Sequence, residues 1–348
     1  MQILESTLLT GPYDWDESVL PRSEYEGRLA RVRAAMSDSG AAALVVHGHP
    51  GDYGALAYLT GFTPKLGTAL VLVPREGPLC IFAGGTPKMM DIAKRLTWVE
   101  DVRPIGAATK LIAESLGDGA TLATWGFATL PQAQYAGIAK AVAPRALLSL
   151  DPALDAVRRH KSPRELEVMR GAARQLAAAV DAFAAGVRAG AGVRSAGLAA
   201  ERAAMAAGAQ DARVMASLSP SGIPLPLDAA GDERVLDPAN AGIVVQNHGY
   251  WASGSVTVAR RPGATNARAR DALAAALAVA RAGTHLPDGV TANAIGLSLD
   301  EGPGAPLEAG AVYAVTASTK EGSETAYASA LIAVTESGCD VLWQGKPA

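Results

Sequence analysis

Short apolar runs and helically spaced apolar residues alternate through the first 150 residues. Apolar side chains that recur every three or four residues predict a helix over 24–38, and they are Tyr25, Leu29, Val32 and Met36. Short apolar runs predict buried strands at 42–47, 68–73, 79–84 and 121–126. Helical stretches separate these runs, near 87–95, 107–116 and 130–142. The alternation predicts an α/β domain with a mixed or parallel sheet over 1–150.

The second half of the chain begins with helices. A helix is expected over 151–158, followed by the basic segment HKSPRE (160–165) at the domain junction. In that segment Ser162 is suited to be an N-cap, Pro163 suits the first helical position, and Glu165 has the spacing of a capping box. An Ala-rich helix should run from there to about residue 187, and a second should cover 193–207.

Beyond residue 210 the pattern changes to strands. They are expected at 212–219, 242–249, 250–260, 311–317 and 327–335, with one helix at 266–282. Helices followed by a run of strands are typical of an α+β domain, here over 151–348. The length of 348 residues agrees with two domains, because single cores stop growing at about 250–300 residues.

Composition and charge restrict the function. The chain is 49% hydrophobic and 19% charged with a formal net charge of −3, and its Lys and Arg residues are scattered, so no nucleic-acid or anionic-membrane partner is expected. No stretch approaches the roughly 18 apolar residues of a membrane span, which favours a soluble, cytoplasmic protein. Cys80 and Cys339 stand in apolar surroundings without metal or redox spacing, so we expect buried, inert thiols.

Several segments carry a resemblance to a known family. They are EYEGRLARVRAAMSDSGAAALVV (24–46), YLTGF (58–62), HKSPRELEVMRGAAR (160–174), SPSG (219–222), GYWAS (249–253), IGLSLDEGP (295–303) and AVTESG (333–338). The chain resembles the creatinase / Xaa-Pro peptidase family, which includes prolidase and aminopeptidase P. The resemblance implies an α/β N-terminal creatinase-like domain, an α+β pita-bread C-terminal domain and a homodimer. It also implies two divalent metals held by two Asp, one His and two Glu.

The positions of this chain that match those ligands carry other residues. GYWAS aligns with the run that ends in the second Asp, and the first Asp stands eleven residues earlier. The aligned residues are Gly242, Ser253, Asn293, Thr316 and Ser329. A register slip of one residue would replace the first two by Ile243 and Gly254, which are not carboxylates either. The histidine that the family carries shortly after SPSG is also missing from 221–231.

The neutral residues at these five positions bear directly on metal binding. Two divalent ions held close together need anionic oxygens to offset their repulsion, and Gly, Ser, Asn and Thr supply no formal charge. We therefore expect no metal and no other cofactor. The connection 283–291 is also too short for a helix that the family places beside the pocket, so the pocket itself should differ.

A metal-free enzyme would need other groups. His248 is the candidate base, with Asn247, Tyr250 and Asn293 to hold a substrate, although His248 can equally be an exposed residue of a hairpin turn. Asp300 and Glu301 are further acid–base candidates, of which at most one can face the pocket, or they form a solvated loop pair. The last candidates follow Thr316, the third lost carboxylate position, and form either a substrate wall or a charged surface loop. They are Lys320, Glu321 and Glu324.

In the first domain His47 and His49, near Asp52 and Tyr53, form a polar cluster that is either a plain loop or part of a pocket in a dimer partner. Trp125 and Trp251 are expected to pack in the core or to wall a pocket. Two functions follow. The first is a metal-free homologue without dimetal hydrolase activity that binds a small molecule or a partner. The second is a metal-independent enzyme that acts on a small amino-acid-like or amide-bearing molecule.

Overall fold

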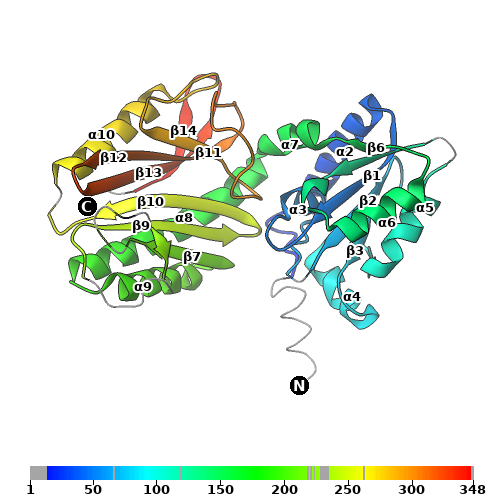
Figure 1. Cartoon of the computed structure of the whole chain (residues 1–348), viewed down its shortest axis with the longest axis horizontal. Coiled ribbons are helices and arrows are strands. Elements are labelled where there is room, and N and C mark those ends of the chain that lie inside the picture. Colours follow the sequence, from blue (N-terminus) through cyan, green and yellow to red (C-terminus); the bar gives the residue numbers. More distant parts are fainter. Residues whose placement is uncertain are drawn as a thin grey trace. The chain divides into compact units, whose positions relative to one another are not determined.

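The computed structural model describes residues 14–65, 67–117, 120–217, 219, 222, 224–227, 235–261 and 263–345 (Figure 1). The chain divides into two compact units, Met1–Arg158 and Arg159–Ala348. The division falls eight residues after the boundary expected at 150/151, because the helix at the junction is counted with the first unit. No helix among the described residues is long and apolar enough to cross a membrane.

The first unit is built on one mixed sheet with the strand order β4-β3-β2-β1-β5-β6. Its strands are β1 (Ala41–Gly48), β2 (Ala69–Pro74), β3 (Cys80–Ala83), β4 (Asp101–Pro104), β5 (Thr121–Trp125) and β6 (Leu147–Ser149). The central strand β1 pairs antiparallel with β2 and parallel with β5. The expected α/β architecture is confirmed, whereas β4 and β6 were not predicted, because their sequences DVRP and LLS contain no apolar run longer than two residues.

The helices of this unit are α2 (Arg22–Asp38), α3 (Gly54–Thr60), α4 (Pro87–Ala93), α5 (Ala108–Glu114), α6 (Gln132–Val142) and α7 (Asp151–Arg159), with short 3₁₀ turns at Lys94–Leu96, Ile105–Ala107 and Phe127–Thr129. Helices α5 and α6 cover one face of the sheet and share a core with its strands. Helix α3 was not predicted, because every residue of it is buried and it has no polar face to reveal its period.

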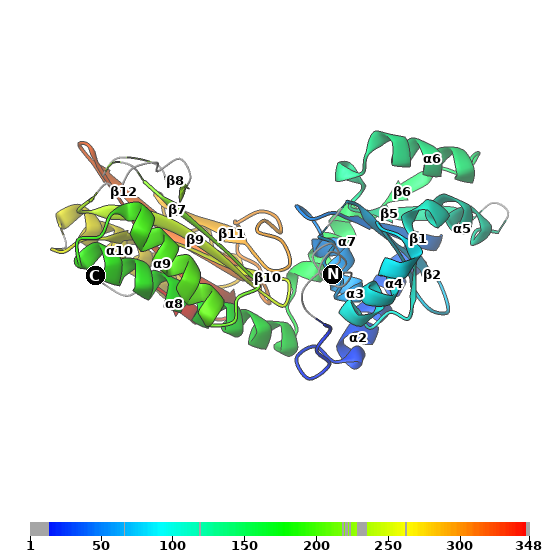
Figure 2. The ribbon, with the colours of Figure 1, turned by 90° about the horizontal axis from the view of Figure 1, so that it is seen from below.

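The second unit has two sheets between two helical layers. The described strands form the orders β10-β9-β7-β8 and β11-β12-β13-β14. Their bounds are β7 (Asp211–Ala216), β8 (Leu225–Pro226), β9 (Ala239–Asn247), β10 (Tyr250–Val258), β11 (Val290–Ala294), β12 (Val312–Glu321), β13 (Glu324–Val334) and β14 (Cys339–Gln344). The helices are α8 (Pro163–Arg188), α9 (Val193–Ala206) and α10 (Ala264–Val279). Figures 1 and 2 show α8 and α9 against the first sheet, and α10 against the second.

Helix α8 begins as the sequence predicts. The Ser162 hydroxyl accepts a hydrogen bond from Glu165 N at 3.1 Å, and the Glu165 carboxylate accepts one from Ser162 N at 2.9 Å. This capping box and Pro163 at the first turn confirm the expected start. The helix is long enough to lie along both β9 and β10, whose alternate side chains it covers.

Each sheet therefore has one covered face and one face that carries the candidate site. Helix α10 packs on the face of β12 and β13 that includes Tyr313, Val315, Ala328 and Ala330. Side chains alternate along a strand, so the intervening residues belong to the other face. Between α10 and β11 the chain runs through 280–289 without a helix, as the short connection implied.

Candidate functional site

The strand register shows which sheet face each of the two alignments uses in the first sheet. Gly242 pairs with Ser255, and Ser253 pairs with Val244, so Gly242 and Ser253 lie on one face of β9 and β10. The alternative residues Ile243 and Gly254 face the helices instead. A Cβ atom added to Gly254 would lie 2.5 Å from the ring of Trp343, so no carboxylate can stand there.

The other three positions share a face of the second sheet. Thr316 pairs directly with Ser329, and Asn293 pairs with Ala314, which is two residues from Thr316 on the same face. Ser329 is 1% exposed, Thr316 is partly buried and Asn293 is exposed. The structure thus brings all five positions onto the two strand faces that the helices leave uncovered.

Ser329 joins the two sheets through its side chain. Its hydroxyl accepts a hydrogen bond from Ser255 N at 2.8 Å and donates one to Ser255 O at 2.8 Å. Both the proton and a lone pair of the hydroxyl are therefore used by the backbone of β10. One lone pair of the oxygen remains, but the neutral hydroxyl brings no negative charge to a cation.

A second side-chain contact continues this junction along the same strands. Thr257 Oγ1 donates to Asn240 Oδ1 at 2.5 Å and accepts from Tyr327 N at 2.7 Å. Asn240 Nδ2 in turn donates to Thr325 O at 3.0 Å. Thr257 and Asn240 are buried, and neutral hydrogen bonds satisfy them. We call the residues Asn240, Ser255, Thr257 and Ser329 the neutral seam.

The residues present do not fit a pair of divalent cations. Hard ions of this kind take carboxylate and carbonyl oxygens, and a dimetal centre needs anionic ligands to offset its charge. The five positions offer two serines, one threonine, one amide and one glycine. Within the described part of the chain, no three His, Cys, Asp or Glu side chains come close enough to hold a metal.

His248 lies in the turn between β9 and β10. Its φ of 47° and the φ of 82° at Gly249 are both positive, which is typical of a two-residue type I′ hairpin turn. Five residues separate His248 from Ser253 along β10, a distance of about 17 Å at strand rise. Its imidazole therefore belongs to the hairpin tip and lies far from the ligand positions.

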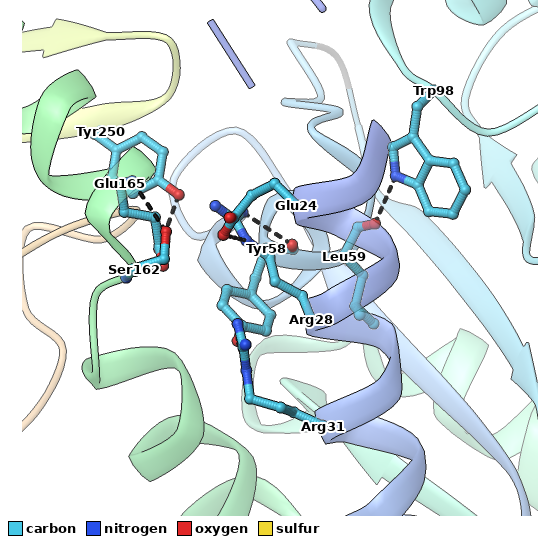
Figure 3. A network of polar contacts seen from close by, with 9 residues as sticks. All are labelled: Glu24, Arg28, Arg31, Tyr58, Leu59, Trp98, Ser162, Glu165 and Tyr250. Atoms are coloured by element: carbon cyan, nitrogen blue, oxygen red, sulfur yellow. Dashed lines mark hydrogen bonds and ion pairs between the residues drawn. The ribbon is translucent and has the colours of Figure 1, made fainter. Parts of the chain in front are cut away.

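Asn247 and Tyr250 face helix α8 and not the candidate site. Asn247 Nδ2 donates to Val168 O at 2.9 Å, and Asn247 Oδ1 accepts from Gln175 at 3.1 Å. Tyr250 is 1% exposed, and its hydroxyl donates to Glu165 at 2.9 Å beside Ser162 (Figure 3). The expected substrate contacts of Asn247 and Tyr250 are replaced by contacts that fix the hairpin to α8.

Asp300 and Glu301 separate as alternation required, but neither reaches the candidate site. Asp300 is exposed and accepts a hydrogen bond from Gly302 N at 2.9 Å. Glu301 forms an ion pair with Lys161 at 2.5 Å, and both side chains are 1% exposed. The second carboxylate oxygen of Glu301 accepts from Leu297 N at 2.9 Å. An acid–base role for Glu301 would require this ion pair to break.

Lys320 and His248 cannot act on one small molecule. Lys320 is exposed and pairs with Thr325, near the end of β10 opposite to the hairpin. Along β10 this separation amounts to on the order of 30 Å. Glu321 forms an ion pair with Arg268 at 3.1 Å, where both side chains are about half exposed, as in the surface-loop interpretation.

In the first unit His47 ends strand β1 and does not lie in a loop. His47 Nδ1 lies 3.0 Å from Gly126 O and donates to it, so Nε2 is unprotonated. That nitrogen is buried and has no hydrogen-bond partner among the described residues. Burial is the main cause that lowers the pKa of His47, aided by His49, whose ring centre is 5.7 Å away. His47 is therefore neutral at pH 7.

The sequence did not reveal the polar core of this unit. Arg28 is buried, and its guanidinium carbon lies 5.0 Å from the ring centres of both Tyr25 and Tyr58. It pairs with Glu24 at 3.0 Å, and Figure 3 shows Arg28 beside Glu24 and Tyr58. Trp125 is buried and donates to Asp155 at 2.9 Å, which confirms the packing role. These contacts support a structural role for both residues.

The two thiols are partly and not fully buried. Burial raises the pKa of Cys80 to about 12 and also raises the pKa of Cys339. Both remain protonated at neutral pH and hence are poor nucleophiles.

Sequence reasoning also missed Arg213 on β7. Its guanidinium carbon lies 5.2 Å from the ring centre of Trp251, on the same sheet face as Ser253. Trp251 therefore does not simply pack in the core or line a pocket, because the guanidinium of Arg213 lies over its ring. No sequence signal reveals this contact, since it depends on the pairing of β7 with β9.

Comparisons with known proteins agree with this architecture. The model of the creatinase/prolidase N-terminal domain matches residues 28–160. The fold is similar to that of an X-Pro aminopeptidase from Thermotoga maritima, with a TM-score of 0.73, 18% identity and coverage of 90% of this chain and 97% of the other. It is similar to a prolidase from Pyrococcus horikoshii, with a TM-score of 0.72, 16% identity and coverage of 92% and 99%.

A dipeptidase PepE from Mycobacterium ulcerans is also similar, with a TM-score of 0.69, 20% identity and coverage of 96% of this chain and 98% of the other. No curated protein sequence matches the chain. The matched N-terminal domain and the pita-bread fold agree with the motifs in the sequence. Residues 28–160 therefore match the creatinase/prolidase N-terminal domain, and the chain has the fold of X-Pro aminopeptidases and prolidases.

Proposed function

We propose that this chain is a metal-free member of the creatinase / Xaa-Pro peptidase family, without dimetal hydrolase activity, and that its C-terminal domain binds a small molecule or a partner. The observation that carries the proposal is Ser329. Both hydrogen bonds of its hydroxyl go to the backbone of Ser255, at the position where the family resemblance expects a carboxylate ligand. The hydrogen bonds of the neutral seam join the two sheets without a cation.

Electrostatics supports the same proposal. Stripping water from a divalent ion costs free energy that only close anionic ligands return. None of the five positions is acidic, and the carboxylates on the described part of the two strand faces are Asp211 and the exposed Asp340 of β14. Asp211 is already paired with Arg213 at 2.8 Å. Without a bound divalent ion, the metal-bound hydroxide that serves as the nucleophile of such hydrolases cannot form.

A metal-independent enzyme is the weaker candidate. General acid–base catalysis needs a titratable group within hydrogen-bond reach of the substrate. The described residues of the two faces include no histidine, and His248 lies at the hairpin tip. We propose that the protein acts in the cytoplasm as a homodimer, which the family resemblance and the sequence support.

A peptidase assay tests the proposal. Purified protein is incubated with Ala-Pro and Mn²⁺ or Co²⁺, and free proline is measured beside an active prolidase. We expect no release above the blank. Metal-dependent release would show that the ligand positions are assigned wrongly. Amide hydrolysis without metal that falls by about 10²–10⁴-fold in His248→Ala would favour the enzyme alternative.

A further inference from the structure

We propose that the strand face carrying Gly242 and Ser253 binds the carboxylate of a small molecule with an apolar body, and that Arg213 recognises that carboxylate. The inference rests on the proposed function, because a dimetal centre beside Ser253 would itself attract a carboxylate. It names the chemical class of the ligand that the metal-free face accepts.

Strand pairing brings Arg213 and Ser253 together. Val244 pairs with Arg213 on one side and with Ser253 on the other, so the three residues form one row across the sheet. The guanidinium carbon of Arg213 lies 5.2 Å from the ring centre of Trp251. The side chains of Arg213 and Trp251 therefore meet over the middle strand β9, on the face that carries Ser253. Trp251 and Ser253 are two residues apart on one face, about 7 Å at strand rise.

The guanidinium has free donors in a fixed orientation. Arg213 Nη2 donates to Asp211 at 2.8 Å, and its remaining N–H groups have no partner among the described residues. Ser253 Oγ likewise has no hydrogen-bond partner within the described ranges. An arginine held flat on an aromatic ring is preorganised for a carboxylate, which can accept from the guanidinium and from a nearby hydroxyl.

The surroundings select for an anion with an apolar remainder. On the described part of the uncovered face of the first sheet, the charged side chains are Asp211 and Arg213. Asp211 accepts only from Nη2, so the remaining guanidinium N–H groups of Arg213 favour an anion over an ammonium ion. Next to the arginine, Met215 Cε lies 3.3 Å from where a Cβ of Gly242 would stand. Met215, Val244 and Trp251 thus offer apolar surface beside the anion site.

Ligand-observed NMR titration of the EDTA-treated protein with 3-phenylpropionate and 3-phenylpropionamide tests the inference. We expect the acid to bind at least 10-fold more tightly than the amide, and Arg213→Met to remove this preference. Arg213→Lys should recover only part of it, because a point charge lacks the planar fork. Arg268→Met is the matched control, since Arg268 is also half exposed and paired with one carboxylate at 3.1 Å.

The outcomes separate the two proposals. Equal affinity for acid and amide, or a preference that survives Arg213→Met, would overturn the carboxylate site and leave the metal-free proposal standing. Tighter binding of the acid after addition of Mn²⁺ would show a metal in the site and overturn both. A loss of preference in Arg268→Met would show that only general surface charge is at work, and would also reject the site.

Discussion

The hydroxyl of Ser329 lies between β13 and β10 and is 1% exposed. It is the smallest group that can satisfy both the N–H and the C=O of Ser255. A carboxylate at this position would be an uncompensated buried charge unless a cation accompanied it. The residue type at 329 therefore matches a domain that folds without metal.

Ser329→Ala should destabilise the protein by about 1–3 kcal/mol, because the N–H and C=O of the half-buried Ser255 lose their partner. Urea unfolding followed by circular dichroism measures this. Ser337→Ala is the control, since Ser337 is exposed and should change stability by less than about 0.5 kcal/mol. Equal effects of the two substitutions would show that Ser329 has no such role.

His47 makes a pH-dependent contribution to stability. Burial lowers its folded-state pKa below the ordinary 6.5, so the folded protein binds fewer protons than the unfolded chain. The contribution is complete above pH 6.5 and is lost as the pH falls through the folded pKa. Of the groups that act on His47, His49 lowers this pKa and Asp52 raises it.

His47→Asn should reduce the loss of stability between pH 7 and pH 5, because an amide can donate to Gly126 O as Nδ1 does and has no charge to gain. Thermal unfolding at intervals of pH measures the slope. His285→Asn, at an exposed histidine, should leave the slope unchanged. An identical slope in His47→Asn and the parent protein would contradict the assignment.

At the scale of elements, the loop at 295–302 is fixed by the ion pair of Lys161 and Glu301, which connects it to the segment before α8. Removing one partner leaves a buried charge, so Lys161→Met should cost about 3–5 kcal/mol. The double variant Lys161→Met/Glu301→Leu should recover most of that loss. Breaking the exposed Arg170–Glu167 pair with Arg170→Ala should cost at most about 1 kcal/mol. Double-variant stability no better than the single would contradict this account.

Strand alternation explains which site predictions the sequence could make. The hairpin signal placed Gly242 and Ser253 on adjacent strands, and the register confirms that they share a face. The same alternation puts Tyr250 on the opposite face from Ser253, so its contact with α8 was foreseeable. The partners of Glu301 and Arg213 come from distant segments, and no local pattern indicates such pairings.

At the scale of the whole molecule, this chain and the similar solved structures share a fold although most of their residues differ. The TM-score of 0.73 to the Thermotoga maritima enzyme stands beside 18% identity. A fold of this kind depends on which positions are apolar and on where helices begin, and both were visible in the sequence. Chemistry depends on single side chains, and a shared fold does not preserve them.

The homodimer expected from the family remains a prediction. Light scattering at micromolar concentration should give twice the 35.5 kDa of one chain. Under the metal-free proposal, the apparent mass should not change with EDTA. A mass near 35.5 kDa would reject the dimer.

The most direct test of the metal-free proposal is the metal content of the purified protein. After incubation with Mn²⁺, Zn²⁺, Fe²⁺ or Co²⁺ and gel filtration, elemental analysis should find no stoichiometric metal, because the five neutral positions cannot offset the dehydration of a divalent ion. An active prolidase treated in the same way provides the reference. Stoichiometric metal that stays bound to the parent protein, and that is lost when Ser253 and Ser329 are replaced by Val, would contradict the proposal.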